Sequence, residues 1–150
     1  MKLLAFDTST EALSVAVGLW HADGRLQLWQ HSGIGGAQAS ATLIPQALAL
    51  LADAGMTLTG LDAIAFGAGP GSFTGLRTAC SVTQGLAFGA GVPVLPVDTL
   101  MAVAEDARHH HGVQRVTALL DARMDQVYVA RYAFDAGNWR PHGEIGLLPL

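Results

Sequence analysis

Apolar and polar residues alternate along the start of the chain. Lys2–Asp7 is a compact apolar run closed by polar residues, which is typical of a buried strand leading into a turn. Residues 13–20 place an apolar side chain at every second position, and Leu26 and Leu28 continue this alternation after Asp23-Gly24, a common hairpin turn. The pattern predicts three strands, of which the second and third form a hairpin.

Helical spacing replaces the alternation after a break expected at Gly33–Gly36. Apolar residues recur every three or four positions from Leu43 to Ala54, with Thr42 as the expected N-cap and Gly55 as the C-terminal cap. Pro45 would then lie in the first turn, where backbone N–H groups have no intrahelical partner.

Strands and helices alternate over the next fifty residues. The expected strands are Leu61–Phe66 and Val92–Val97, and the expected helices are Leu76–Phe88 and the segment between the cap Asp98 and Gly112. Prolines 93 and 96 place the second of these strands at a sheet edge.

This order of elements indicates a fold class. A doubly wound dinucleotide-binding fold starts strand-helix-strand, whereas three antiparallel strands followed by helix-strand repeats resemble the α/β ribonuclease-H-like half of the actin, sugar-kinase and Hsp70 (ASKHA) superfamily. Residues 113–120 and 126–132 predict a further hairpin around 123–125. We expect a complete first half at residues 1–112 and an incomplete second half at residues 113–150, in a chain that continues beyond its apolar end.

Composition narrows the classes of function. Apolar residues make up 51 % of the chain and charged residues 13 %, against a charged share of about 25 % in typical domains, which excludes a disordered chain. The apolar runs are shorter than the roughly 20 residues that a membrane span needs. A single cysteine, Cys80, indicates the reducing cytoplasm. A net charge of −4 without a Lys/Arg cluster disfavours RNA binding by this chain alone.

The glycine-rich segment Gly67–Arg77 carries the strongest motif, GAGPGSFTGLR. Backbone N–H groups of such a loop, together with the N-terminus of the following helix, can bind an anion. The spacing fits neither a phosphate-binding loop nor a dinucleotide fingerprint. Alternatively, the glycines only form a turn and Ser72 or Thr74 caps the helix. Both interpretations remain open.

A second candidate is the loop that follows the first strand. In an ASKHA fold, a carboxylate at Asp7 would hold a metal–nucleotide complex. The loop has no basic residue, which favours the alternative that its side chains only satisfy the turn. A vestigial nucleotide site would comprise Asp7, Thr8, Ser9, Gly69, Gly71, Ser72, Thr74 and Gly75.

The sequence offers no metal site and no catalytic residue. No two of the six histidines stand four apart on a predicted helix, and the three consecutive ones at 109–111 cannot converge on one ion. Cys80 lies among small residues without a neighbouring His or Lys, so packing is the expected role of this thiol.

The first two predicted helices are almost uncharged, which suggests a second buried side that meets a partner. The candidate interface residues are Leu43, Ile44, Ala47, Leu48, Leu76, Ala79, Cys80, Val82, Thr83 and Gly85.

Several motifs resemble the bacterial TsaB (YeaZ) family. They are FDTST with LSVA, LIP, LDAIA leading to GPGSFTGLR, QGLA, and DARM before VY, and the resemblance extends from Lys2 to about Tyr132. Ala39-Ser40-Ala41 stands where the family often has His-Ser-Glu.

The resemblance implies a non-catalytic subunit in the formation of N6-threonylcarbamoyladenosine at position 37 of tRNA. It implies pairing with the catalytic paralogue TsaD, recruitment of the ATPase TsaE, and homodimers through the helical face when the chain is alone. It further implies no cofactor for this chain, ATP and Mg only at the level of the complex, tRNA only within the complex, and no membrane. The alternative is an ATP-binding phosphotransferase of the same superfamily, in which Asp7 holds Mg-ATP.

Overall fold

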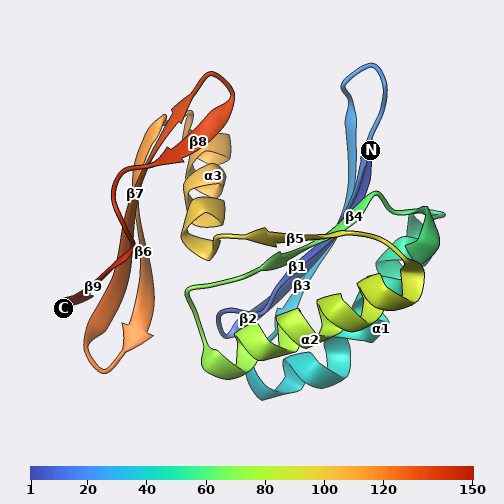
Figure 1. Cartoon of the computed structure of the whole chain (residues 1–150), viewed down its shortest axis with the longest axis horizontal. Coiled ribbons are helices and arrows are strands. Elements are labelled where there is room, and N and C mark those ends of the chain that lie inside the picture. Colours follow the sequence, from blue (N-terminus) through green and yellow to red (C-terminus); the bar gives the residue numbers. More distant parts are fainter. The chain divides into compact units, whose positions relative to one another are not determined.

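The computed structural model describes all residues from Met1 to Leu150, and the chain divides into two packing units. The first unit comprises Met1–Ala68 and Ser72–Pro96, and the second comprises Gly69–Gly71 and Val97–Leu150. Each unit contains a sheet of its own (Figure 1). None of the helices is long and apolar enough to cross a membrane.

A five-stranded sheet with the order β3-β2-β1-β4-β5 forms the centre of the first unit. β1 (Lys2–Asp7) pairs antiparallel with β2 (Ala12–Trp20), which pairs antiparallel with β3 (Leu26–Ile34). On its other side, β1 pairs in parallel with β4 (Ala63–Gly67). β5 (Val94–Val97) lies at the edge, as its prolines predicted. The predicted three-strand opening is therefore confirmed.

Two helices, α1 (Ala39–Asp53) and α2 (Phe73–Ala90), lie side by side over one face of this sheet (Figure 1). Short 3-10 turns at Gly36–Gln38 and Leu58–Gly60 precede α1 and β4. The core between helices and sheet consists of buried apolar side chains. These are chiefly Leu4, Phe6, Leu13, Val15, Val17, Leu43, Ala47, Leu50, Leu51, Ile64, Ala79 and Ala87.

The third strand differs from its prediction in length and in orientation. It continues through Gly33, which pairs with Leu13, so the expected break does not begin there. Leu26 and Leu28 are 48 % and 51 % exposed. Trp29 packs against the core instead, because it stands opposite the buried Val17 and shares its face.

The first helix begins earlier than its prediction. α1 starts at Ala39, and Thr42 is not its cap, since the Thr42 hydroxyl donates to the carbonyl of Gln38 at 3.1 Å. Pro45 therefore lies inside the helix rather than in a harmless first turn, and the prediction was wrong on both points. The predicted C-terminal cap is confirmed, since Gly55 takes a φ of 65° directly after the helix.

The second unit contains a four-stranded sheet. β6 (Arg115–Arg123) and β7 (Gln126–Asp135) form the predicted hairpin, with positive φ at Arg123, Met124 and Asp125. β8 (Asn138–Pro141) and β9 (Gly146–Pro149) both pair with β7 and were not predicted.

α3 (Thr99–His111) packs against β6 and β7, and it belongs to the same packing unit as these strands. The core there consists of Leu100, Ala104, Ala118, Ala130 and Tyr132. The domain boundary expected after residue 112 remains a prediction.

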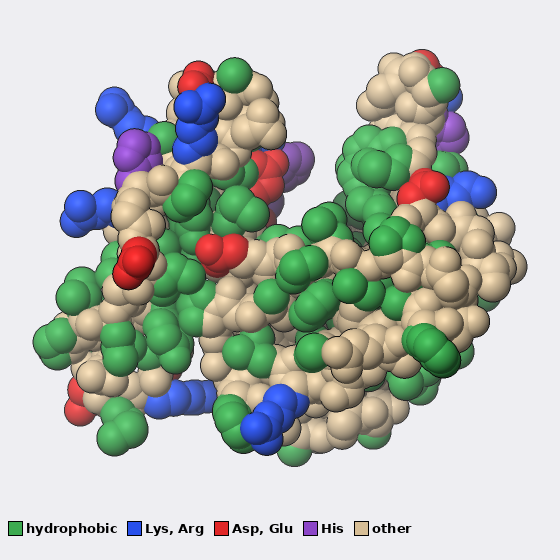
Figure 2. Space-filling view, viewed as in Figure 1, with side chains coloured by type: hydrophobic (Ala, Val, Ile, Leu, Met, Phe, Trp, Pro, Cys, Tyr) green, Lys and Arg blue, Asp and Glu red, His purple; other side chains and the backbone are tan.

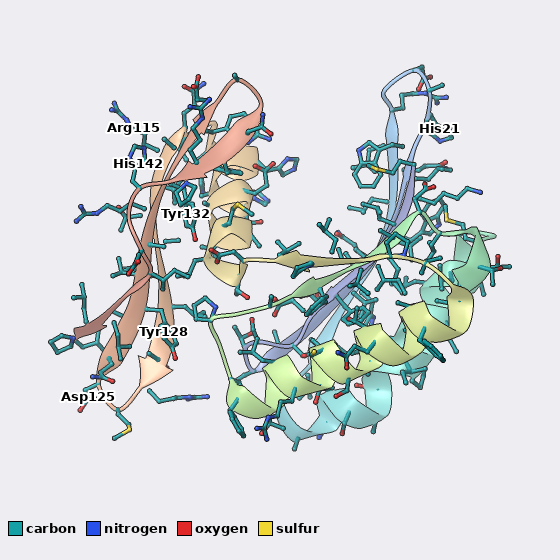
Figure 3. The ribbon with its side chains drawn as sticks, viewed as in Figure 1. His21, Arg115, Asp125, Tyr128, Tyr132 and His142 are labelled. Atoms are coloured by element: carbon teal, nitrogen blue, oxygen red, sulfur yellow. The ribbon has the colours of Figure 1, made fainter.

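The N-terminus of α3 is fixed by its predicted cap. Oδ1 of Asp98 accepts from the N–H of Leu100 at 2.8 Å and from that of Met101 at 3.3 Å. The Tyr132 hydroxyl extends from β7 and donates to Oδ2 of Asp98 at 2.7 Å (Figure 3). Burial, followed by the hydrogen bond to Asp98, raises the pKa of Tyr132 above its ordinary value.

A second anchor joins α3 to β8. Nε1 of Trp139 donates to Oε2 of Glu105 at 2.8 Å, and Nε of Arg108 donates to the same oxygen at 2.8 Å. The hydrogen bonds from Arg108 are the main reason that the pKa of Glu105 lies below its usual value, and the bond from Trp139 adds to them.

Candidate functional site

The end of β1 meets the beginning of α2 within the first unit. Oγ1 of Thr8 donates to the carbonyl of Gly75 at 2.6 Å, and the N–H of Ser72 donates to the carbonyl of Ser9 at 2.7 Å. Ser72 is the N-cap of α2, and its hydroxyl accepts from the N–H of Gly75 at 3.4 Å. One of the two predicted caps is therefore confirmed, and the loop after β1 holds the first turn of the helix.

The carboxylate of Asp7 lies against the backbone of Gly67. β1 and β4 are parallel, and a Cβ atom at Gly67 would stand 1.8 Å from Oδ2 of Asp7. Oδ1 of Asp7 accepts from the backbone N–H of Ser9 at 2.7 Å and from its hydroxyl at 2.5 Å. A side chain at position 67 would thus collide with the Asp7 carboxylate in the orientation that bonds Ser9. The sequence does not reveal this contact, because Gly67 stands there only as the first residue of a glycine-rich segment.

Thr8 and Ser9 are 0 % and 2 % exposed, and their hydroxyl groups are engaged in the bonds just described. This arrangement supports the interpretation that the loop side chains satisfy the turn. Thr74 is exposed on the first turn of α2. Gly69 and Gly71 belong to the second unit, where the carbonyl of Gly69 accepts from the N–H of Thr99 at 2.9 Å. Nucleotide binding by these residues remains a prediction.

The side chains of the metal-ligating residue types do not gather at one point. No cluster of three or more His, Cys, Asp or Glu side chains is placed to hold a metal ion.

Four of the predicted interface residues face the core. Leu43 and Ala47 of α1, and Ala79 and Thr83 of α2, are each 0 % exposed. Side chains enclosed between the helices and the sheet cannot contact a partner, so the interface prediction was wrong for these four. Helical spacing alone did not distinguish the inner from the outer side of a helix whose residues are uniformly small and uncharged.

The other six predicted residues are accessible. Ile44 and Leu48 are 39 % and 45 % exposed. Gly85 is exposed, and a Cβ atom there would meet no heavy atom within 4 Å. We call this group the α1/α2 surface. Its members are Ile44, Leu48, Leu76, Cys80, Val82 and Gly85.

Two aromatic residues of α2 extend the α1/α2 surface and were missed. Phe73 is 68 % exposed and lies under the guanidinium of Arg77, 3.7 Å from its ring centre, and Phe88 is 92 % exposed. Their exposure could have been inferred from the helical spacing of Phe73, Arg77, Ser81 and Phe88. Figure 2 shows mainly uncharged side chains on this side of α2, apart from a basic group near its start.

Two depressions mark the α1/α2 surface. One of about 380 Å³ lies between Ser40 and the α2 side chains Phe73, Arg77 and Val82. The other, of about 670 Å³, lies at the far end of α2, where Gly85 and Phe88 contribute to its lining. The larger depression is lined mainly by apolar residues and glycines, which suits the docking of another protein surface. The smaller one combines Phe73 and Val82 with hydroxyl side chains and Arg77.

Comparison with known proteins identifies relatives over most of the chain. The sequence model of the family described as "TsaD: tRNA N6-adenosine threonylcarbamoyltransferase" matches residues 34–141. The tRNA threonylcarbamoyladenosine biosynthesis protein TsaB of Escherichia coli K12 is 43 % identical over 145 residues, which cover 96 % of this chain and 60 % of the relative. The protein of the same name from Haemophilus influenzae is 43 % identical over 133 residues, which cover 87 % of this chain and 53 % of the relative.

Solved structures give the same result for the fold. YeaZ from Pseudomonas aeruginosa aligns with a TM-score of 0.87 and 44 % identity. The alignment covers 99 % of this chain and 67 % of the YeaZ chain. RuvC of Thermus thermophilus, at 18 % identity, and a PPX-GPPA enzyme of Aquifex aeolicus, at 11 %, each align with a TM-score of 0.50. These two distant likenesses concern the fold alone, and they confirm the predicted ribonuclease-H-like, ASKHA-type α/β class.

The chain spans 53–60 % of the length of the curated relatives described above. The alignment with the Escherichia coli relative covers 96 % of this chain. The chain belongs to the TsaB (YeaZ) family.

Proposed function

We propose that the chain is part of an accessory, non-catalytic subunit of tRNA N6-threonylcarbamoyladenosine formation, and that it pairs with TsaD through the α1/α2 surface. The curated relatives carry the name of this pathway. The observation that carries the proposal is the sparsely charged outer side of α1 and α2, where Ile44, Leu48 and Phe88 are exposed and Arg77 lies near the start of α2. Exposed apolar side chains on a helix pair with few charges are typical of a surface that a partner covers.

The loop geometry supports the non-catalytic part of the proposal. The hydroxyl groups of Thr8 and Ser9 are used to hold α2 and the turn. In the proposed assembly, ATP and Mg act at the level of the complex, TsaE joins the pair, and tRNA is bound only there. Without TsaD, the α1/α2 surface holds two copies of the chain together.

The test is co-purification of the chain with TsaD from the same organism. Gly85→Arg places a long, charged side chain on the α1/α2 surface at a position with free space, so the fold is retained. We expect this variant to lose the complex in size-exclusion chromatography while its circular dichroism stays unchanged. Ala22→Arg, at the exposed β2–β3 turn, is the matched control and retains the complex. A full complex with Gly85→Arg would show that the proposed interface is wrong.

The phosphotransferase alternative makes a different prediction. It requires the isolated chain to bind Mg-ATP in a way that depends on Asp7. The accessory-subunit proposal expects no micromolar binding in calorimetric titration. Micromolar binding that disappears in Asp7→Ala would favour the enzyme.

A further inference from the structure

Basic side chains form a regular array on one face of the second sheet. α3 packs on the face that carries Ala118, Ala130 and Tyr132. Successive strand residues point to opposite faces, so Arg115 on β6 and Arg131 on β7 lie on the other face.

The strand register brings further basic residues into the same array. Ala133 pairs with Arg115 on one side and with Arg140 of β8 on the other, which forms one row across three strands. In the next row, Arg131 pairs with Thr117 and receives a 2.8 Å hydrogen bond to its carbonyl from the N–H of His142. We call this group the basic array. It consists of Arg115, Arg131, Arg140 and His142.

All four side chains of the basic array are exposed. Figure 3 shows Arg115 and His142 close together on the side of the sheet away from α3, and Figure 2 shows basic and His side chains gathered there. The acidic side chain paired with the array is that of Asp135, whose Oδ2 lies 3.6 Å from Nη2 of Arg140. Arg115 and Arg131 have no acidic partner within 4.0 Å. With His142 neutral, the array together with Asp135 therefore has a net charge of about +2, in a chain whose net charge is −4.

The array ends abruptly along the sheet. Leu119 follows Thr117 by two residues on β6, so it lies on the same face of the sheet as the basic array, and it is 56 % exposed. Leu148 of β9 is 50 % exposed. The unpaired arginines thus lie toward the end of the sheet near the β7–β8 turn, whereas Arg123, at the opposite end of β6, is paired with Asp121. A short basic segment beside an apolar one defines a local site rather than a generally basic surface.

The geometry suits a polymeric anion. Neighbouring strands lie roughly 4.8 Å apart, so Arg115 and Arg140 stand about 10 Å from each other across Ala133. Guanidinium groups bind phosphate oxygens in a bidentate manner. Separated, exposed guanidinium groups on an open sheet face match successive phosphates of a nucleic-acid strand better than one small anion. Contacts of this type position an RNA and do not read its sequence.

We propose that the basic array binds the phosphate backbone of tRNA when the chain is assembled with TsaD. This inference rests on the proposed function, because that function supplies the RNA. The remaining acidic surface of the chain keeps its own RNA affinity low, so the array acts within the complex. Its role is to orient the tRNA.

The test uses the complex of the chain with TsaD and measures tRNA affinity by fluorescence anisotropy from 50 to 300 mM salt. We expect the double variant Arg115→Gln/Arg131→Gln to bind tRNA roughly tenfold more weakly, with a log–log salt slope that is smaller by about 2. The matched control is Lys2→Gln/Arg25→Gln, which also removes two positive charges but does so in the first unit. We expect this control to keep the salt slope of the wild-type chain. Asp135→Asn removes the acidic partner of Arg140, so we expect it to tighten tRNA binding about twofold.

The possible results separate this inference from the proposed function. If the double variant pairs with TsaD and binds tRNA with unchanged affinity and slope, the inference is overturned and the proposed function stands. If the double variant no longer pairs with TsaD although the wild-type chain does, the array contacts protein, and the inference is also overturned. Failure of the wild-type chain to pair would overturn both.

Discussion

Thr8 and Gly75 stand 67 positions apart in the sequence and are joined by a buried 2.6 Å hydrogen bond from the hydroxyl of Thr8 to the carbonyl of Gly75. The two residues are also in close backbone contact, because a Cβ atom at Gly75 would lie 1.7 Å from the carbonyl oxygen of Thr8. The hydrogen bond and the close approach together fix the first turn of α2 to the end of β1. The glycine is therefore required by packing, independently of any ligand.

Gly75→Ala tests this requirement. The added methyl group cannot be accommodated unless α2 moves away from β1, so we expect the free energy of unfolding to fall by about 3 kcal/mol or more. Gly89→Ala is the matched control, since this exposed glycine of α2 has free space and alanine favours the helix by about 1 kcal/mol. Urea denaturation followed by circular dichroism measures both. Equal stability of Gly75→Ala and wild type would contradict the close approach.

Two buried threonines are expected to respond in opposite ways to the same substitution. Thr8→Val removes the donor to Gly75, and we expect a loss of about 1–2 kcal/mol. The Thr83 hydroxyl is buried without a hydrogen-bond partner. Thr83→Val is therefore expected to raise stability by up to about 1 kcal/mol, because a buried polar group is replaced by a methyl group of similar shape. Thermal unfolding of the two variants compares them directly, and a shift of the same sign would refute the assignment.

Local signals made much of the first unit predictable from sequence. The hairpin between β2 and β3 follows from alternation and an Asp-Gly turn, and the cap at Asp98 follows from residue type. Residue type narrowed the cap of α2 to Ser72 or Thr74, and the structure selects Ser72. Two predictions failed where tertiary contacts decide. Pro45 is tolerated inside α1, and Leu26 and Leu28 are exposed because strand pairing puts Trp29 on the core side.

The candidate sites were less predictable, because they depend on which residues face each other. Ala79 and Gly85 are both small residues of α2, yet the first is buried and the second is exposed. The basic array could not be read from the sequence, since Arg115 and Arg140 are far apart in the chain and only the register of three strands aligns them. The short strand β8, with its mixed composition, had no periodicity to reveal it.

Glu105 is expected to contribute to stability in a pH-dependent way. The hydrogen bonds from Arg108 lower the pKa of Glu105 in the folded chain below its unfolded value. Its contribution is then present above the unfolded pKa, near 4.5, and is lost as the pH falls through the lower folded value. The side chain is 45 % exposed, so solvent screening limits the effect of Glu105→Gln to about 1 kcal/mol or less at pH 7.

Thermal unfolding at two pH values measures this contribution. We expect the difference between wild type and Glu105→Gln to shrink from pH 7 to pH 3. Asp106→Asn, on the adjacent and more exposed position of α3, serves as the control for a general charge effect. A difference that is the same at both pH values would show that packing, rather than charge, accounts for the role of Glu105.

The opposite pH dependence is expected for Tyr132. Burial and the hydrogen bond to Asp98 raise the pKa of its hydroxyl in the folded chain, whereas the unfolded value is near 10. As the pH rises past 10, the unfolded state loses its proton first, so the stabilisation is complete below pH 10 and declines above it. Tyr128→Phe leaves Tyr132 as the only tyrosine, and we expect its tyrosinate absorbance near 295 nm to appear only as the chain unfolds in alkali. Adding Asp98→Asn to this variant removes the charged acceptor, so tyrosinate should then form at lower pH. Ionisation near pH 10 in the intact Tyr128→Phe fold would mean that Tyr132 is neither buried nor bonded to Asp98.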